Sequence, residues 1–269
     1  MGYLFDPDNW EWITSGNNLR FLLEGFLVNL EIAAIAIAFS LAFGLLLALA
    51  RLSKLTPLSV GAGVWVDVWR NLPLIFIILY LALALPEPWK DAYESVVPGF
   101  FPEARQSGRV FAGILGLVLY NSAVIAEIMR AGILSLDRGQ GEAAASLGLT
   151  YPQQLRYVIL PQGLRRMVPA TVSQLITLNK DTTLVSIIAI EEVMRHGRTL
   201  SSGFTAFVGG VPAPLLQVFL FIGLLFVVTN LALSRLSRRL EIRERKRTGG
   251  TAGPVSGLED QVAFAAESR

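Results

Sequence analysis

The sequence has no cysteine and only one histidine, His196. Disulfides, thiolate chemistry, cysteine-based metal sites and multi-histidine metal sites are therefore excluded. Charged residues are also scarce, at 16% of the chain against roughly 25% in an average soluble domain. With 53% hydrophobic residues and a mean hydropathy of +0.53, the composition places the chain among membrane proteins.

The N-terminus lacks the basic stretch followed by an apolar run that marks a cleavable signal peptide. Met1–Trp12 is instead acidic and aromatic. This composition is typical of an amphipathic element at the membrane surface, and a disordered tail is the alternative. We expect residues 1–18 to form an external amphipathic segment.

Long apolar runs are the dominant pattern of the sequence. Ile32–Ala50 has no charged residue and approaches the about 20 residues that a helix needs to cross the hydrocarbon core. The polar, proline-rich segment Pro86–Gly108 is a poor candidate for a further span. The sequence predicts an all-α integral membrane protein with about five transmembrane helices in residues 19–240. The predicted spans are Leu19–Ala50, Val64–Leu85, Val110–Leu136, Arg165–Ile190 and Val211–Leu236.

Basic residues follow the first, third and fifth predicted spans, on one side of the membrane if there are five spans. By the positive-inside rule this side is the cytoplasm, so the N-terminus is expected outside and the C-terminus inside. Residues 241–269 are predicted to form a disordered cytoplasmic tail. The basic residues concerned are Arg51, Lys54, Arg138, Arg156, Arg165, Arg166, Arg235, Arg238, Arg239, Arg243, Arg245, Lys246 and Arg247.

The polar loop 138–161 between the third and fourth spans is predicted to hold two short helices. The alanines after Glu142 favour a helix, and Gly148 suits its C-terminal stop. Thr150 and Gln153 have capping-box spacing for a second helix, which Pro161 is expected to end. Two interpretations are open: a simple connector, or a rigid knob that docks into a partner.

The same loop resembles the EAA loop of ABC importer permeases, in which two coupling helices sit in a cleft of the ATPase subunit. The fixed residues are a Glu-Ala-Ala triplet, a glycine and a closing Leu-Pro, and Val158 stands where the family usually has isoleucine. The resemblance implies that these residues carry the ATPase contact. In this sequence they are Glu142, Ala143, Ala144, Gly148, Leu160 and Pro161.

Three further segments are similar to the polar amino-acid branch of that family. They are residues 69–74 (WRNLPL), 121–133 (NSAVIAEIMRAGI) and 180–186 (KDTTLVS). Departures are Leu72 in place of the usual threonine, the long segment 86–108 and the long tail. The resemblance implies an importer of polar amino acids in the bacterial cytoplasmic membrane, with glutamate, aspartate or glutamine slightly favoured over arginine because of Lys180.

The resemblance also implies the partners: a cytoplasmic ABC ATPase, an external substrate-binding protein, a second permease copy or a sister permease, and membrane lipids, but no nucleic acid. The sequence has no GxxxxGK[ST] phosphate loop. We therefore expect no enzymatic activity and no cofactor in this chain, with ATP and Mg²⁺ bound by the partner ATPase. An intramembrane enzyme and a channel or transporter that works alone are the alternatives; the first lacks a catalytic constellation, and the second leaves the loop 138–161 unexplained.

Lys180 and Asp181 are the charged pair expected deepest in the membrane, where an uncompensated charge is costly. Together with Thr183 they are candidates for a break in the fourth span that lines the translocation path, with Lys180 meeting a substrate carboxylate. The alternative is that the two charges face neighbouring helices and only hold the bundle together.

Other polar residues in the spans have more ordinary interpretations. Glu127 and Arg130 are three residues apart and are expected to pair, although Glu127 is also a path candidate, as is Asn121. Asp67 and Arg70 have the same spacing and the same expected pairing. His196 is expected to be a solvated loop residue.

Overall fold

A computed structural model of the chain describes residues 6–97, 106–202 and 213–247. Every regular element in these ranges is helical. The elements are η1 (Pro7–Ile13), α2 (Asn18–Arg51), α3 (Thr56–Asn71), α4 (Leu74–Ala84), α5 (Glu87–Val96), α7 (Gly108–Leu134), α8 (Arg138–Ser146), α9 (Tyr151–Gln154), η2 (Leu155–Ile159), α10 (Leu160–Asp181), η3 (Thr182–Ile188), α11 (Val193–Ser201) and α12 (Leu215–Arg247).

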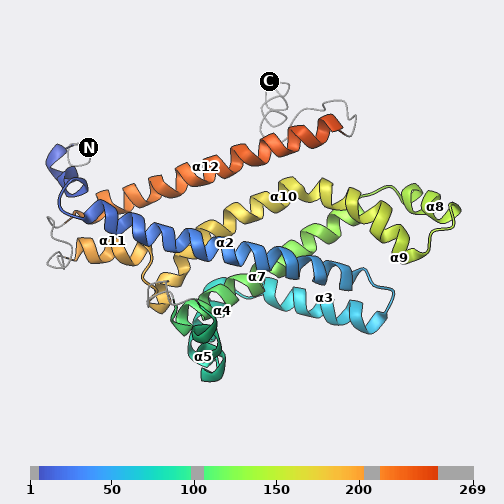
Figure 1. The fold of residues 1–269 in the computed structure, drawn as a ribbon, viewed down its shortest axis with the longest axis horizontal. Coiled ribbons are helices and arrows are strands. Elements are labelled where there is room, and N and C mark those ends of the chain that lie inside the picture. Colours follow the sequence, from blue (N-terminus) through green and yellow to red (C-terminus); the bar gives the residue numbers. More distant parts are fainter. Residues whose placement is uncertain (1–5, 98–105, 203–212, 248–269) are drawn as a thin grey trace, which may run out of the picture.

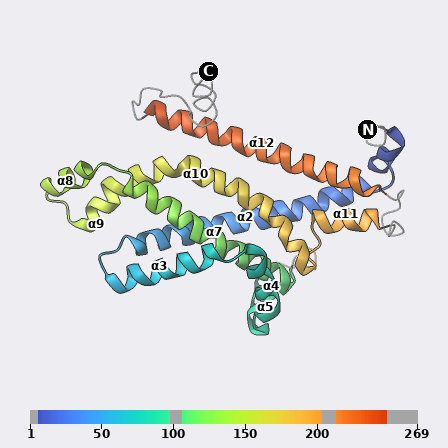
Figure 2. The same cartoon turned by 180° about the vertical axis from the view of Figure 1, so that it is seen from behind.

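The long helices α2, α7, α10 and α12 run side by side along the molecule (Figures 1 and 2). The short helices α8 and α9 project from one end, which we call the hairpin end, while η1 and α11 lie at the opposite, N-terminal end (Figure 1). The helices α4 and α5 lie together on one side of the bundle, near α7. The α8–α9 pair and the η1–α11 pair therefore lie at opposite ends of the long axis of the molecule.

Small residues allow α2 and α7 to pack closely. A Cβ added at Gly44 would lie 2.8 Å from Ile125 Cγ2, which is nearer than carbon atoms approach. Ala36 and Ala48 of α2 are fully buried, whereas Phe39 and Leu46 are more than half exposed. This division gives α2 one face for the helix bundle and another for lipid or a second chain.

The second predicted span, Val64–Leu85, is wrong as a single helix. The chain bends by 101° between α3 and α4. Leu72 adopts an extended conformation, as a residue before proline does, and Pro73 precedes the first residue of α4. The apolar run is thus a broken span or a re-entrant segment.

Among the described residues, three helices are long and apolar enough to cross a membrane: α2, α7 and the Leu215–Arg235 part of α12. The bent pair α3–α4 raises this number to four if it counts as one span. The fourth predicted span, Arg165–Ile190, corresponds to α10 and η3, and the polar residues of α10 keep it below the same hydropathy. The all-helical membrane fold is confirmed. Five spans were expected and composition supports up to four; the difference is α10, which was counted as a span but is too polar to qualify.

Two expectations for the N-terminal end change with the structure. Trp12 of η1 is 1% exposed and packs edge-on against Phe221 of α12, so this end of the segment lies inside the bundle. The expectation of a solvated His196 is wrong, because this side chain is buried in α11 and stacks on Phe21 at 3.8 Å. At the other terminus α12 continues to Arg247, and the tail 248–269 lies outside the described residues.

Candidate functional site

The α8–α9 hairpin, residues 138–159, is closed by local hydrogen bonds. Asp137 caps α8 by accepting a hydrogen bond from the Gly139 N–H at 2.7 Å. At the other end Gly148 has a φ of +78°, its N–H donates to the Ala145 carbonyl at 2.9 Å, and the next N–H donates to the Ala144 carbonyl at 3.2 Å. This is a Schellman motif, which requires the left-handed backbone that glycine adopts without strain.

The second part of the hairpin differs from the expectation at Pro161. Thr150 and Gln153 begin α9 as predicted, with the Thr150 N–H donating to Gln153 Oε1 at 2.8 Å. The predicted break at Pro161 is wrong, because the helix continues from η2 into α10. The chain passes the proline by way of the π-helical turn η2, in which the Leu160 N–H donates to the Leu155 carbonyl. Proline has no N–H, and the widened turn accommodates this loss.

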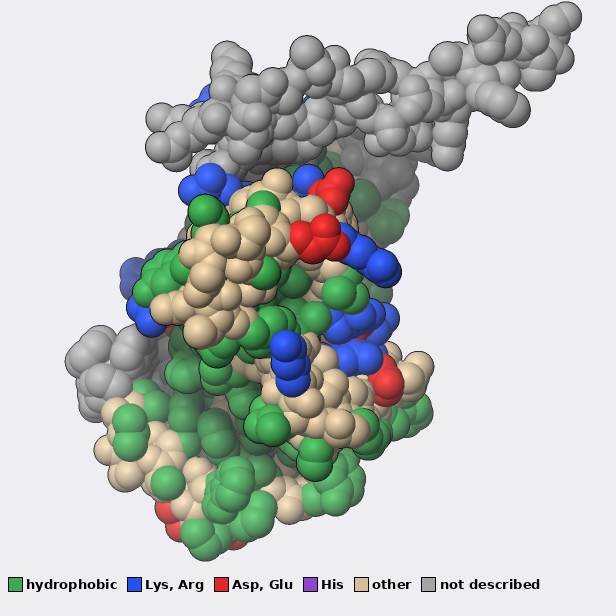
Figure 3. Space-filling view, turned by 90° about the vertical axis from the view of Figure 1, so that its right-hand side faces the viewer, with side chains coloured by type: hydrophobic (Ala, Val, Ile, Leu, Met, Phe, Trp, Pro, Cys, Tyr) green, Lys and Arg blue, Asp and Glu red, His purple; other side chains and the backbone are tan. Residues whose placement is uncertain are grey.

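The six residues predicted to contact an ATPase divide into two groups. Ala144 is 2% exposed and Leu160 is half-buried, so both pack within the hairpin end. The exposed group comprises Glu142, Ala143, Gly148 and Pro161. Leu147, which the sequence analysis did not single out, is 81% exposed at the C-terminal end of α8. Figure 3 looks at this end and shows Lys and Arg side chains around it.

The helix α10 carries polar residues toward two neighbouring helices. Gln174 Nε2 donates to Oδ1 of Asn121, a fully buried residue of α7, at 2.8 Å. Asn179 Nδ2 donates to Asn230 Oδ1 of α12 at 3.0 Å. The predicted path residue Asn121 thus holds α7 and α10 together, and its side chain is shielded from solvent in the single chain.

A second face of α10 is exposed. Arg166, Ala170, Ser173 and Lys180 are all exposed, and their successive separations of four, three and seven residues place them on one side of the helix. Asp181 and Thr183 are half-buried, and the Thr183 hydroxyl donates to the Lys180 carbonyl at 2.9 Å. Because lipid offers no hydrogen bonds, such a face must meet water, a polar ligand or another chain.

The residues after Lys180 are held at the N-terminal end by a buried polar cluster, defined as Asn29, Thr182, Glu192 and the backbone of Val193. Asn29 Nδ2 donates to Thr182 Oγ1 at 3.2 Å and to Glu192 Oε2 at 3.0 Å, and Asn29 Oδ1 accepts from the Val193 N–H at 3.1 Å. Asn29, Thr182 and Glu192 are fully buried. One asparagine of α2 therefore fixes both ends of segment 182–192.

That segment contains a strained residue. Ala189 has a φ of +61°, in the left-handed region that side chains other than glycine rarely adopt. It ends η3 and precedes Glu192, whose carboxylate caps α11 by accepting from the Arg195 N–H at 2.9 Å. Burial raises the pKa of Glu192 and lowers the pKa of His196 beside it in α11, so burial disfavours the charged form of each. Sequence reasoning missed this cluster because Asn29 lies more than 150 residues before its other members.

Charged residues gather at the hairpin end of α2, α3 and α7. The expected pair of Glu127 and Arg130 is confirmed, and Glu127 also forms an ion pair with Arg51. Asp67 lies 3.9 Å from Arg51, and this ion pair replaces its expected one with Arg70. Glu127, predicted as a path candidate, accepts hydrogen bonds from Arg51 of α2 and Arg130 of α7. Its side chain therefore links α2 to α7.

A known family accounts for this arrangement. The family described as "Binding-protein-dependent transport system inner membrane component" matches residues 29–246. The chain belongs to this family. It is therefore a membrane component of a binding-protein-dependent transport system, and the resemblance based on the EAA loop is confirmed.

Individual relatives agree with the family. The chain is 40% identical over 230 residues to "Probable glutamine ABC transporter permease protein GlnP" of Bacillus subtilis (strain 168), covering 86% of this chain and 96% of that protein. It is 31% identical over 234 residues to "Glutamate/aspartate import permease protein GltK" of Escherichia coli O157:H7, covering 87% of this chain and 98% of that protein.

Two solved structures share the fold. The crystal structure of an amino acid ABC transporter with histidines matches with a TM-score of 0.67 and 27% identity, covering 84% of this chain and 94% of that one. An inward-facing structure of the MetNI methionine ABC transporter matches with a TM-score of 0.59 and 21% identity, covering 82% and 96% of the two chains. The helix arrangement is therefore that of an ABC transporter permease.

Proposed function

We propose that the chain forms the translocation path of an ATP-driven importer for polar amino acids, with glutamine, glutamate and aspartate as the favoured substrates. The observation that carries the proposal is the exposed polar face of α10, which lies between α7 and α12. A second copy of the chain, or a sister permease, would face this surface across a water-filled path. The substrates named for GlnP and GltK support the choice of cargo.

Energy for transport would come from a separate cytoplasmic ABC ATPase. The α8–α9 hairpin projects from the bundle, presents Glu142, Ala143 and Leu147 to solvent, and is stiffened by its Asp137 cap and its Schellman motif. A rigid exposed hairpin suits docking into a cleft. ATP and Mg²⁺ would be bound by that partner, and an external binding protein would deliver the substrate.

This assignment also gives the orientation. The hairpin end, with its Arg and Lys residues, would face the cytoplasm, and the end that carries η1 and α11 would face outward. Lys180 is close to the C-terminal end of α10, far along the helix from the hairpin, so it would meet substrate that enters from outside.

The role of Lys180 can be tested by replacement with methionine, which removes the charge and keeps an unbranched side chain one atom shorter. If the ammonium binds a substrate carboxylate, the KM for uptake rises about tenfold or more, because charge-assisted hydrogen bonds contribute about 1.5–3 kcal/mol. Lys180→Arg is the matched control, since it keeps the charge. An unchanged KM for Lys180→Met in a correctly assembled transporter would remove Lys180 from the path.

A further inference from the structure

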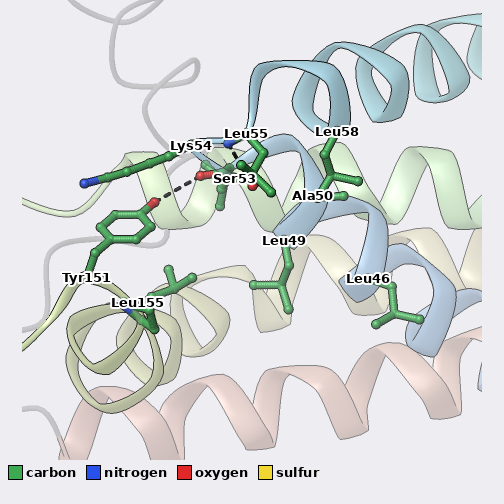
Figure 4. A pocket seen from close by; sticks show the side chains of 11 residues that line it. Leu46, Leu49, Ala50, Ser53, Lys54, Leu55, Leu58, Tyr151 and Leu155 are labelled. Atoms are coloured by element: carbon green, nitrogen blue, oxygen red, sulfur yellow. Dashed lines mark hydrogen bonds between the residues drawn. The ribbon is translucent and has the colours of Figure 1, made fainter.

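Tyr151, the first residue of α9, joins the α8–α9 hairpin to the C-terminal end of α2. Its hydroxyl donates to the Leu52 carbonyl at 3.0 Å, and Leu52 is the residue that caps the C-terminus of α2. The Lys54 ammonium lies over the tyrosine ring, 4.2 Å from the ring centre. Figure 4 shows the ring pointing toward the turn that connects α2 and α3, with the Lys54 side chain beside it.

A groove of about 450 Å³ separates the two elements beside this contact. Most of its lining comes from leucines of α2, the α2–α3 turn and the start of α3, and the hairpin contributes Tyr151, Pro152 and Leu155. The apolar packing between the hairpin and α2 is therefore incomplete here. The polar contact of Tyr151 and its ring contact with Lys54 span the gap that side-chain packing leaves open.

Two other hydrogen bonds near the hairpin link neighbouring parts of the chain. Gln162 Nε2 donates to Gln140 Oε1 at 3.2 Å, and the Arg166 guanidinium donates to the Ser135 carbonyl at 2.8 Å. Both link the start of α10 to the α7–α8 region. The Tyr151 contact instead joins residues 99 apart in sequence and connects the hairpin to the first long helix.

The Leu52 end of this contact is itself well anchored. Arg51, the preceding residue, forms the ion pair with Glu127 of α7. Its carbonyl accepts a hydrogen bond from the Ser59 hydroxyl of α3 at 2.8 Å. A displacement of Tyr151 would therefore act at a point where α2, α3 and α7 are tied together.

We propose that Tyr151 is a positioning residue that transmits movement of the α8–α9 hairpin to α2 and α3, in parallel with the direct covalent route into α10. The proposal rests on the proposed function, because it needs an ATPase that moves the hairpin. The Tyr151–Leu52 hydrogen bond holds the two elements in register, and the Lys54 ammonium, attracted by the negative face of the ring, keeps the ring in place.

The test is the number of substrate molecules imported per ATP hydrolysed. The full-length chain is reconstituted in proteoliposomes with its ATPase and binding protein, and uptake and hydrolysis are measured on the same vesicles. Tyr151→Phe removes the hydrogen bond and keeps the ring. We expect the ratio to fall about fivefold, which corresponds to a net hydrogen bond of about 1 kcal/mol, while ATP hydrolysis continues.

Tyr157→Phe is the matched control. Tyr157 belongs to the same hairpin, is 62% exposed and has Arg156 over its ring at 5.6 Å, so it shares the ring and the cation but lies on the exposed surface. Its ratio should equal that of the wild type. Lys54→Met should lower the ratio as well, and Lys54→Arg should restore it, because arginine also binds an aromatic face.

A purely structural role would lower uptake and hydrolysis in proportion and leave the ratio unchanged. An equal ratio in Tyr151→Phe and Tyr157→Phe would overturn the inference. If the wild-type complex showed no ATP-driven uptake, the proposed function would fail and this inference with it, a result that differs from uncoupling in the variant alone.

Discussion

The two ends of the bundle are built in different ways. At the N-terminal end, Asn29, Glu192 and His196 are buried, and a Cβ added at Gly25 would lie 2.6 Å from His196 Nδ1. At the hairpin end, Gly148 has open space around it and Leu147 is 81% exposed. The first end is tightly packed around polar groups, whereas the second is joined to the bundle by a few separate contacts.

This difference indicates where movement can start. A tightly packed polar cluster has one favourable arrangement, since an unpaired buried group costs free energy. The hairpin is continuous with α10 and is otherwise held by single hydrogen bonds, so it can move relative to α2 at a small cost. The hairpin end therefore suits the reception of a mechanical signal, and the N-terminal end suits a fixed support.

The largest expected effect is the loss of the buried polar cluster at the N-terminal end. Asn29→Ala removes the donor to Glu192 and to Thr182 and leaves the Val193 N–H without its acceptor. We expect a loss of about 3 kcal/mol in the free energy of unfolding, because several buried polar groups lose their partner together. Thermal unfolding of the purified protein in detergent measures it.

Asn71→Ala is the control for this change. Asn71 is exposed, and its side chain donates to the Asp67 carbonyl one turn earlier in the same helix. Its replacement should cost about 0.5 kcal/mol or less. Equal losses in the two variants would contradict the view that the buried cluster stabilises the N-terminal end.

A smaller effect is expected from Gly25→Ala, which tests the close packing of α2 on α11. The added methyl group would meet the His196 ring and the Glu192 backbone, so one of the two helices must shift. Overpacking of this kind costs about 1–3 kcal/mol. The measurement is again the unfolding temperature, with Gly61→Ala as control, because a Cβ at Gly61 has nothing within 4 Å. A neutral Gly25→Ala would show that the contact is loose.

The smallest loss is expected at the hairpin. Gly148→Ala meets open space as Gly61→Ala does, but its φ of +78° imposes a strain of about 1–2 kcal/mol on any residue with a Cβ. We expect little change in the stability of the bundle and weaker co-purification with the ATPase. Retention of the ATPase at the wild-type level would indicate that the Schellman motif does not shape the docking surface.

Local features of the structure could be predicted from the sequence, whereas its long-range contacts could not. The hairpin depends on Ala, Gly and Pro at fixed positions within about twenty residues. Its two helices and the helix end at Gly148 could therefore be predicted. The bend at Pro73 also has a local cause, but the apolar run on both sides of it concealed the bend. Hydropathy was least informative for α10, whose polar residues bond to other helices.

The buried polar cluster shows why the long-range contacts could not be predicted from the sequence. Asn29 lies in an apolar run, and Glu192 and His196 lie in a segment that reads as polar and exposed. Their burial follows from the packing of α11 against α2 and α12, which no local pattern encodes. The close approach depends on Gly25 and Gly197, whose role appears only when the partner helices are known.

We infer that this chain conducts a polar amino acid only when a separate ATPase acts on its hairpin. The most direct test is uptake of labelled glutamine or glutamate into proteoliposomes that contain the chain, its ATPase and its binding protein. We predict uptake that requires ATP and that is lost when the ATPase is omitted. Uptake at an equal rate without the ATPase would contradict it.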